Sequence, residues 1–475
     1  MLASDSSTSD CASVLSQVTA KLTFVAVLSE LVLIALTWRL WIGASSFPSV
    51  PLIPNLPWNP KLAAVAASGY LFVLSALLLL SGLEWMFPKT HAVACPLIHI
   101  QTGTLRQFAT WLSLILGVLI TVTNQHLLQA WHWFFLLCLL QLAVFSRSHS
   151  VTGMLRYTIA AVYLSSAVSR FTPEIEASMT GEIVAALLRM IGKPLAAADP
   201  STVRVLCLLL TAGEFLAGLV LICSHSAGLI IGCTTVLHLS LIAALGPWGL
   251  NHFPAVLCWN ISFLLIISVI MWSESTLRRC AGLPCDAAPE SSSERKRTDP
   301  ARPPSPRIQT KSAILMSVFL FGIPASGLFG IADNWLSWQL YSSRPEVFRL
   351  FVRSDVVDRL PLSLQPFVGP TEPLDDWCPV RIDRWSLSET GAPIYPEDRF
   401  QFAVIEAAIV ALRAAESENI SAENATSPNE DDRLKIVVEF PERVCWWRRT
   451  TQTYSGSLGL QELHRQLRQR TFLIR

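Results

Sequence analysis

Long apolar runs divide most of the chain into segments of membrane-spanning length. A helix needs about 20 apolar residues to cross a bilayer core. Such runs lie at roughly 22–43, 62–84, 108–124, 127–145, 151–169, 205–223, 227–245, 255–272 and 313–331. The fifth run is the weakest, because its apolar part is short and contains Arg156, so a tilted or re-entrant helix is an alternative there. The pattern predicts a mainly α, multi-pass transmembrane bundle of about nine spans.

Polar segments divide the chain into parts. In chain order we expect N-terminal transmembrane helices over 1–104, a central membrane bundle over 105–272, a disordered linker over 273–311, a further transmembrane helix over 312–331 and an extramembrane α+β domain over 332–475. Between the fifth and sixth spans, residues 180–193 place Ile183 and Met190 on one helical face. This pattern predicts a helix that lies on the membrane surface.

In the last 140 or so residues, segments with apolar residues at helical spacing alternate with segments that have the residue pattern of strands. Helices are predicted over 396–415, where a proline occupies the first turn, and over 460–470. Strands are predicted over 379–387, 434–440 and 444–449, while 344–352 is amphipathic and the acidic insert 416–432 is expected to be disordered.

Composition and charge narrow the class of protein further. Of 475 residues, 52% are hydrophobic and only 15% charged. The net charge of +1 gives no basic field for a phosphate backbone, so the expected partner is a lipid bilayer and not nucleic acid. No Lys or Arg precedes Lys21, which favours a retained first helix over a cleaved signal peptide.

The basic residues of the loops predict an orientation. Twelve Lys and Arg side chains fall on the side of the N-terminus and the linker, and five on the other side. Cytoplasmic loops carry the excess of basic residues. We therefore expect a plasma-membrane protein with a cytoplasmic N-terminus and a C-terminal domain outside the cytoplasm.

Eleven cysteines occur mostly singly in apolar stretches, as buried core residues do. Cys378 and Cys445 are the only two in the C-terminal domain, and in an oxidising compartment they could form a disulfide; the alternative is two buried thiols. No metal-binding or nucleotide-binding motif is present, and no metal site is predicted.

An acidic residue inside the sixth span is the most informative single feature. Ionisable groups at that depth are costly unless they are paired or line a polar cavity, so they are candidates for function. Glu214 and His238 lie at similar depths below the turn near His225, about 16 to 20 Å from it at 1.5 Å per residue. Small residues on both helices, Gly213 with Ala217 and Gly228 with Gly232, would permit close approach.

The sequence leaves the role of this polar pair open. It predicts a Glu214–His238 hydrogen bond that moves a proton or holds a polar head group, or else a structural clasp between two helices. Glu30 is a second carboxylate within a span, with Arg39 as a local partner. Asn251, His252 and Asn260 offer further donors and acceptors near a Gly-Pro turn, which is equally consistent with an interfacial turn.

Residues 105–272 resemble the redox-associated membrane proteins of the DoxX and MauE type, and more distantly the membrane core of vitamin K-dependent carboxylase-like proteins. The resemblance covers about a third of the chain and rests on short apolar motifs: NQHLLQAW (124–131), YLSSAVSRF (163–171), GEFLAG (213–218), His238, GPWGLNH (246–252) and Trp259-Asn260. Such proteins usually have a lysine where this chain has Ser169-Arg170. An arginine cannot act as a base at neutral pH, which argues against carboxylase activity.

The resemblance implies an accessory role in membrane-associated redox chemistry or envelope protein maturation. It implies a quinone as cofactor and an envelope redox protein as partner. The predicted centre is Glu214 with His238, and its outer end would be lined by Tyr163, Arg170, Asn251 and His252, with Asn260 nearby. Two alternatives stay open: a carboxylase-like enzyme that acts on a lipid-soluble substrate, and a non-catalytic anchor that displays the C-terminal domain.

Overall fold

The computed structural model describes residues 4–43, 46–53, 60–87, 96–146, 148, 150–193, 199–280, 307–342, 345–371, 375–420, 433–442 and 448–468. Within these residues the protein is mainly helical, with one small antiparallel sheet near the C-terminus.

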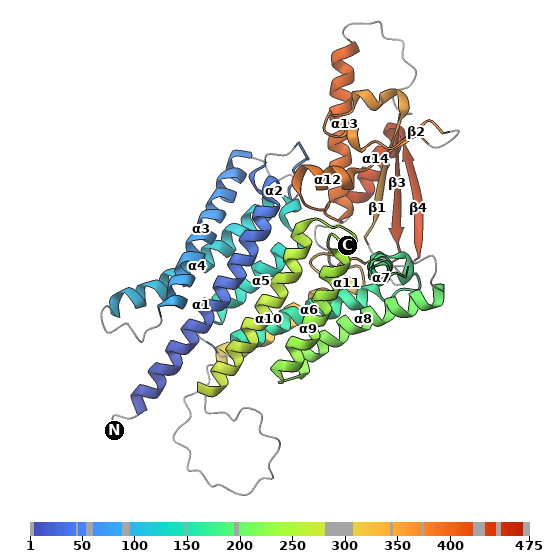
Figure 1. The fold of residues 1–475 in the computed structure, drawn as a ribbon. Helices are drawn as coiled ribbons and strands as arrows, with labels where there is room; N and C mark the ends of the chain where they lie inside the picture. The colour runs from blue at the N-terminus through green and yellow to red at the C-terminus, as the bar shows by residue number, and fades with distance from the viewer. Residues whose placement is uncertain are drawn as a thin grey trace.

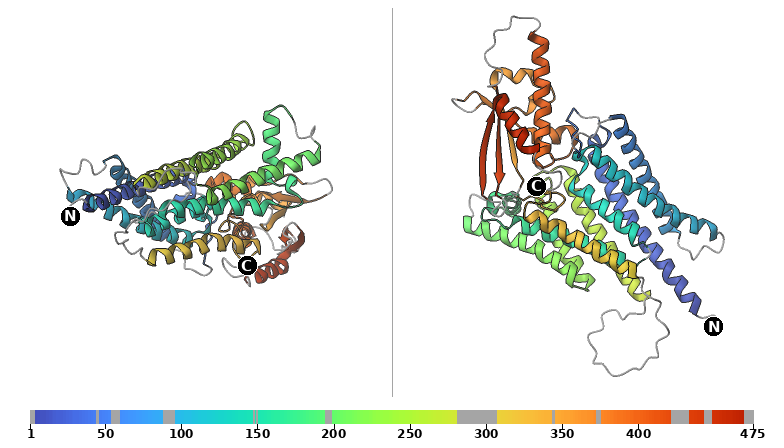
Figure 2. Two further views of the ribbon diagram at one scale, coloured as in Figure 1. Left: turned by 90° about the horizontal axis from the view of Figure 1, so that it is seen from below. Right: turned by 180° about the vertical axis from the view of Figure 1, so that it is seen from behind.

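Long helices form a bundle with two distinct ends (Figure 1). They are α1 (Ser4–Leu36), α3 (Pro60–Met86), α4 (Pro96–Thr123), α5 (Ala130–Val144), α6 (Ser150–Arg170), α8 (Pro200–Cys223), α9 (Ala227–Leu245), α10 (Pro254–Cys280) and α11 (Arg307–Leu328). The start of α1 and the end of α10 lie at one end of the bundle, and the C-terminal sheet lies beyond the other end (Figure 1). The α3–α4 and α8–α9 pairs lie on opposite flanks (Figures 1 and 2).

Seven helices of the described chain are long and apolar enough to cross a membrane: α1, α3, α4, α8, α9, α10 and α11. The nine-span prediction also included the regions of α5 and α6. Helix α5 has only 15 residues, 12 of them buried, and α6 carries Arg156 and Arg170. Both pack inside the bundle, so protein and not lipid surrounds them. The prediction of many apolar membrane helices is confirmed at this coarser level.

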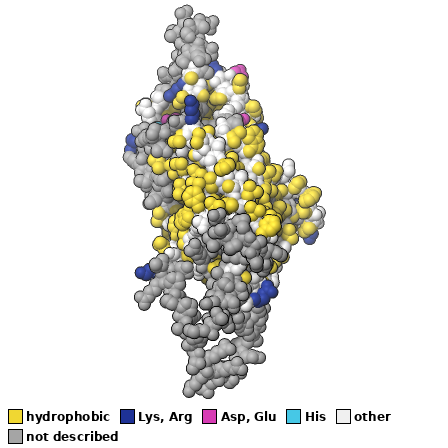
Figure 3. Space-filling view, turned by 90° about the vertical axis from the view of Figure 1, so that its left-hand side faces the viewer, with side chains coloured by type: hydrophobic (Ala, Val, Ile, Leu, Met, Phe, Trp, Pro, Cys, Tyr) yellow, Lys and Arg dark blue, Asp and Glu magenta, His cyan; other side chains and the backbone are white. Residues whose placement is uncertain are grey.

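The flank formed by α3 and α4 exposes large apolar side chains. Phe72 is 75% exposed, Phe108 65% and Ile115 60%. Apolar side chains form a broad band across this flank (Figure 3). Such a band is larger than the isolated apolar residues of soluble proteins and fits contact with a lipid bilayer.

The C-terminal domain is built on a four-stranded antiparallel sheet. The strand order is β2-β1-β3-β4, formed by β2 (Trp377–Val380), β1 (Val347–Arg353), β3 (Leu434–Pro441) and β4 (Arg449–Ser455). Strand β1 alternates buried and exposed side chains, and its Leu350 pairs with Ile436 of β3. Its buried face packs against the helices α12 (Ile382–Thr390), α13 (Asp398–Ile420) and α14 (Gly456–Arg468) in one core. The predicted α+β domain is therefore present.

Several predicted boundaries in this domain were wrong. The strand expected over 379–387 ends at Val380 and continues as helix α12, and the amphipathic segment 344–352 contains strand β1. The last strand runs over Arg449–Ser455, beyond the predicted end at 449, while 443–447 lie outside the described residues. Helix α10 continues to Cys280 and α11 starts at Arg307, so both enter the predicted linker; the insert 421–432 and the linker residues 281–306 lie outside the described residues.

The bundle and the C-terminal domain share a core. Phe47 and Leu128, which belong to the bundle end of the molecule, join the buried cluster of Phe400 and Trp385 in the domain. Across the same boundary, Arg39 Nη1 donates to the carbonyl of Ser388 at 3.2 Å. The domain is thus packed on the bundle as one body.

The predicted surface helix is present as α7 (Met179–Met190), with Ser178 as its N-cap. It buries Ile183 and Ala186 against α8 and α9 and is too short to cross a bilayer. In Figures 1 and 2 it lies at the domain end of the bundle, beside the ends of the strands.

Candidate functional site

The two members of the predicted polar pair have different partners in the structure. Glu214 on α8 forms a buried ion pair with Arg170 at the end of α6. No hydrogen bond joins Glu214 to His238 among the described residues, so the predicted pairing is corrected. Residue spacing along two helices sets depth, but it does not fix which way the helices face.

His238 instead lies in a three-residue cluster between α6, α9 and α10. Its Nδ1 lies 2.9 Å from Asn260 Oδ1, and Tyr163 Oη contacts its Nε2. Asn260 Nδ2 donates to the carbonyl of Val256 at 2.8 Å, which turns Oδ1 toward His238. Nδ1 therefore donates to Asn260 and Nε2 accepts from Tyr163. A neutral His238 has both ring nitrogens satisfied in this arrangement.

The predicted small-residue stripes do not explain how these helices pack. A Cβ atom added to Gly213, Gly228 or Gly232 would meet nothing within 4 Å. The close approach occurs at Gly218 of α8, where an added Cβ would lie 2.9 Å from Leu164 of α6. Helix α8 therefore packs its small residue against α6 and not against α9.

Asn251 and His252 lie outside the cluster, in the turn between α9 and α10. The turn folds back on the end of α9, with the His252 amide donating to Leu245 O at 2.8 Å. Asn251 adopts a φ of 51°. Burial lowers the pKa of His252, and Glu182 of α7 opposes that shift. The structure favours a structural turn here, and it does not bring these two residues to His238.

Tyr341, just after α11, lies close enough to Arg170 to interact electrostatically with it. The Arg170–Glu214 pair thus lies at the boundary between the bundle and the segment that leads into the C-terminal domain.

A second buried centre lies between α1, α3 and α5. Glu30 Oε1 accepts from Tyr70 Oη at 2.5 Å and from His132 Nδ1 at 2.9 Å. All three side chains have no exposed surface. Because both donors use Oε1, Glu30 Oε2 has no partner among the described residues, and neither has His132 Nε2. Arg39 bonds to Ser388 and not to Glu30, so the expected local pairing is also corrected.

Aromatic rings and a glycine fit this second centre closely. Trp41 stacks on Tyr70 with ring centroids 6.0 Å apart and meets His132 edge-on at 5.1 Å. A Cβ on Gly117 of α4 would lie 3.1 Å from the Tyr70 ring and 2.5 Å from Leu136. Sequence analysis named Glu30 but missed Tyr70 and His132. A histidine inside an apolar run, HWFFLLC, was the available signal.

Helix α6 carries polar side chains at seven-residue spacing. Arg156, Tyr163 and Arg170 therefore lie on nearly the same helical face. Each contacts a different part of the bundle: Arg156 pairs with Glu274 of α10 at 3.1 Å, Tyr163 contacts His238, and Arg170 pairs with Glu214. The row of polar contacts runs along α6 from one bundle end to the other.

The expected disulfide stays a prediction. Cys378 is a buried thiol in β2, and Cys445 lies outside the described residues.

The described residues contain no group of three or more His, Cys, Asp or Glu side chains that could hold a metal ion. A scan against protein-family models, a search of curated proteins and a search of solved structures each found no match for this chain.

Proposed function

We propose that this integral membrane protein is an accessory in membrane-associated redox chemistry or envelope protein maturation, as a relative of the DoxX and MauE type would be. In this proposal the bundle serves a quinone-class molecule, and the C-terminal domain, packed on one bundle end, faces a partner protein. The plasma membrane, a cytoplasmic N-terminus and a C-terminal domain outside the cytoplasm belong to the proposal.

The observation that carries the proposal is the pair of unpartnered atoms at Glu30 and His132. A buried polar atom without a hydrogen bond costs about 1–3 kcal/mol, and more when charged. Buried ionisable groups in membrane bundles are correspondingly associated with function. The Arg170–Glu214 and Tyr163–His238–Asn260 contacts satisfy their members and fit a structural clasp. Of these three groups, the Glu30 centre is the one in which a carboxylate oxygen and a ring nitrogen have no partner among the described residues.

The chemistry of the Glu30 centre fits the reduced form of a quinone. Since His132 Nδ1 donates to Glu30, Nε2 of a neutral ring carries a lone pair and accepts a hydroxyl hydrogen. Glu30 would hold the ring in this tautomer and stabilise it when Nε2 takes up a proton. Tyr70 fixes the carboxylate, and the surrounding rings exclude water. A bound quinone would supply the two-electron chemistry.

Binding of a short-chain hydroquinone tests this proposal. The full chain in lipid nanodiscs would be equilibrated with the hydroquinone under reducing conditions, and the retained amount measured by mass spectrometry against empty nanodiscs. We expect His132→Phe to lower the affinity at least about tenfold, because one hydrogen bond to a charged pair is worth about 1.5–3 kcal/mol.

The exposed His225, in the turn between α8 and α9, provides the matched control. His225→Phe removes an imidazole far from Glu30 and should leave retention unchanged. Absence of retention above empty nanodiscs, or equal retention by wild type and His132→Phe, would contradict the proposal.

The shared core favours a second candidate, a non-catalytic anchor for the C-terminal domain. Phe47 and Leu128 pack with Phe400 across the boundary, which holds the domain in a fixed orientation. An anchor needs no ligand at Glu30, so the same binding experiment separates the two functions.

A further inference from the structure

A cleft of about 450 Å³ lies between α13 and α14 on the C-terminal domain. Phe402, Ile409 and Leu460 contribute apolar surface to it, and Ser457 and Gln461 contribute polar groups. Small-molecule sites have volumes of about 300–1,000 Å³ and combine an apolar lining with a few polar groups. The cleft has this size and composition, and it is far from both centres in the bundle.

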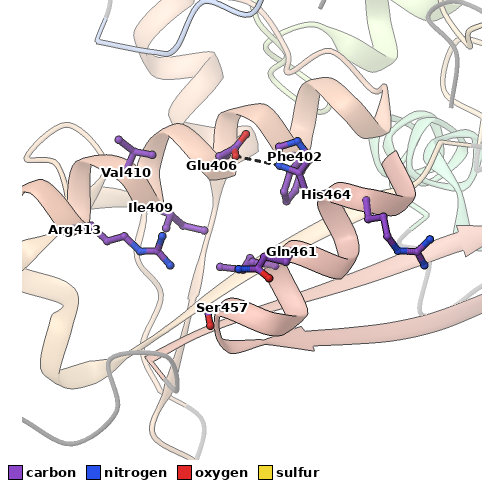
Figure 4. Close-up of a pocket in the computed structure, with 10 residues that line it drawn as sticks. Phe402, Glu406, Ile409, Val410, Arg413, Ser457, Gln461 and His464 are labelled. Atoms are coloured by element: carbon purple, nitrogen blue, oxygen red, sulfur yellow. Dashed lines mark ion pairs between the residues drawn. The ribbon is translucent and has the colours of Figure 1, made fainter. Parts of the chain in front are cut away.

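The charged groups of the cleft differ in whether they are already paired. Glu406 Oε1 and His464 Nδ1 lie 3.4 Å apart as an ion pair on one side of the cleft (Figure 4). Arg465 is held by Glu462 through two contacts of 2.8 and 2.6 Å. Arg413 has no hydrogen bond or ion pair to any described residue. Arg413 is therefore the arginine of this cleft whose guanidinium has no partner among the described residues.

The position of Arg413 makes the two ends of the cleft chemically different. Arg413 extends from α13 toward the side on which Ser457 and Gln461 of α14 lie (Figure 4). Phe402 lies eleven residues earlier on the same helix, about 16 Å away along its axis. The cleft thus has Arg413 at one end and apolar side chains along its length, with the Glu406–His464 pair beside Phe402. An arginine fork matches a carboxylate in a two-bond geometry.

We infer that this cleft binds an amphipathic carboxylate, whose anionic head pairs with Arg413 and whose apolar tail lies along Ile409, Leu460 and Phe402. Gln461 and Ser457 would contribute hydrogen bonds beside the head group. Two sources share this chemistry: a fatty acid, and the C-terminus of an apolar peptide. The inference does not depend on the proposed function, because no residue of the bundle takes part.

Photo-crosslinking locates such a ligand even though it also partitions into lipid. The full chain in nanodiscs would be labelled with an octanoate that carries a diazirine in its tail, and the modified residues mapped by mass spectrometry. We expect labels within 398–420 and 456–468. Octanoate should compete with this label at least about tenfold better than octanamide, which lacks the charge.

Two variants test the role of Arg413. Arg413→Gln should reduce labelling of the cleft at least about tenfold, whereas Arg353→Gln, which removes an exposed cation paired with Asp355 and Asp376, should leave it unchanged. Competition by an N-acetylated leucine dipeptide acid, but not by its amide, would identify a peptide C-terminus as the source. Competition by octanoate alone would identify a fatty acid.

The inference is overturned if the cleft is not labelled, if octanamide competes as well as octanoate, or if Arg413→Gln labels like the wild type. Because Arg413 is exposed and has no partner among the described residues, its replacement leaves the fold intact and the comparison interpretable.

Discussion

Individual polar side chains in the bundle differ in whether their bonding capacity is used. His238 has a partner at each ring nitrogen, and Arg170 and Glu214 neutralise each other. Glu30 and His132 each leave one buried atom without a partner among the described residues. The first arrangement stabilises contacts between helices, whereas the second leaves one carboxylate oxygen and one ring nitrogen unused.

The Arg170–Glu214 pair allows a direct test of the structural role. Removing one member leaves an uncompensated buried charge, which costs about 3–5 kcal/mol, while removing both members costs much less. We therefore expect Arg170→Gln to lower the midpoint of thermal unfolding markedly in nanodiscs, and the double variant Arg170→Gln/Glu214→Gln to recover most of the loss.

Arg189, an exposed cation on α7, supplies the control. Arg189→Gln should change the midpoint little, because exposed charges contribute within about 0.5 kcal/mol. If the double variant is as unstable as Arg170→Gln alone, the two side chains do not act as a pair.

The residue types of the site were more predictable than its pairings. Glu214, His238, Tyr163, Arg170 and Asn260 were all named from the sequence, and the structure places them in or beside the polar contacts. Their partners were not predicted, because depth along a helix follows from residue number but the direction a helix faces depends on tertiary packing. His132 was missed for a related reason: its partner Glu30 is about 100 residues away in the sequence.

At the scale of elements, the end of α9 depends on backbone that leaves no room for a side chain. A Cβ on Gly249 would lie 1.9 Å from the carbonyl oxygen of Ala244, which the chain cannot relieve by moving a side chain. The turn also receives the amide of Leu250 at the same carbonyl, at 2.8 Å. The glycine is therefore required for the turn that sets the direction of α10.

Two glycine-to-alanine substitutions should distinguish a steric requirement for glycine in this turn from the general effect of replacing a glycine in a helix. We expect Gly249→Ala to lower the free energy of unfolding by about 2 kcal/mol or more, since the backbone must shift. Gly232→Ala, at an open position inside α9, should instead raise it by about 0.5–1 kcal/mol. Thermal unfolding of both variants in nanodiscs measures the two effects, and a neutral Gly249→Ala would show that the turn can rearrange.

Helices with a long, regular spacing of apolar residues were predicted well from the sequence. Short elements, and segments that combine strand and helix, were not. The long apolar helices and α13 follow directly from their spacing of apolar residues. The strand predicted over 379–387 failed because its second half forms α12, whose buried Trp385 contacts the shared core. Periodicity over four residues cannot separate strand from helix, and tertiary packing decides.

At the scale of the whole molecule, a shared contact region joins the bundle to the C-terminal domain. His126, between α4 and α5, is buried there and its Nε2 lies 3.0 Å from the carbonyl oxygen of Pro393. Burial lowers the pKa of His126 to about 4. The unfolded chain, with an ordinary value near 6.5, binds the proton more readily between those two pH values.

This shift predicts how acid affects the joined molecule. The contribution of His126 to stability is present in full above about pH 6.5 and is lost progressively as the pH falls toward 4, by up to about 3 kcal/mol. Thermal unfolding at pH 7.5 and pH 5 should show this loss in wild type and a smaller loss in His126→Gln. An identical pH dependence in both proteins would show that His126 does not titrate with unfolding.

The polar row on α6 has a consequence for how the protein enters the membrane. An arginine costs about 2.5–3.5 kcal/mol during insertion at the centre of a span and less toward its ends, and α6 carries Arg156 within its length and Arg170 at its last residue. Their partners Glu274 and Glu214 lie on α10 and α8, which the ribosome makes later. We therefore expect α6 to be unstable in lipid when it first leaves the translocon. We expect α6 to stay next to the translocon until α8 and α10 have been synthesised, and to enter the bilayer together with them.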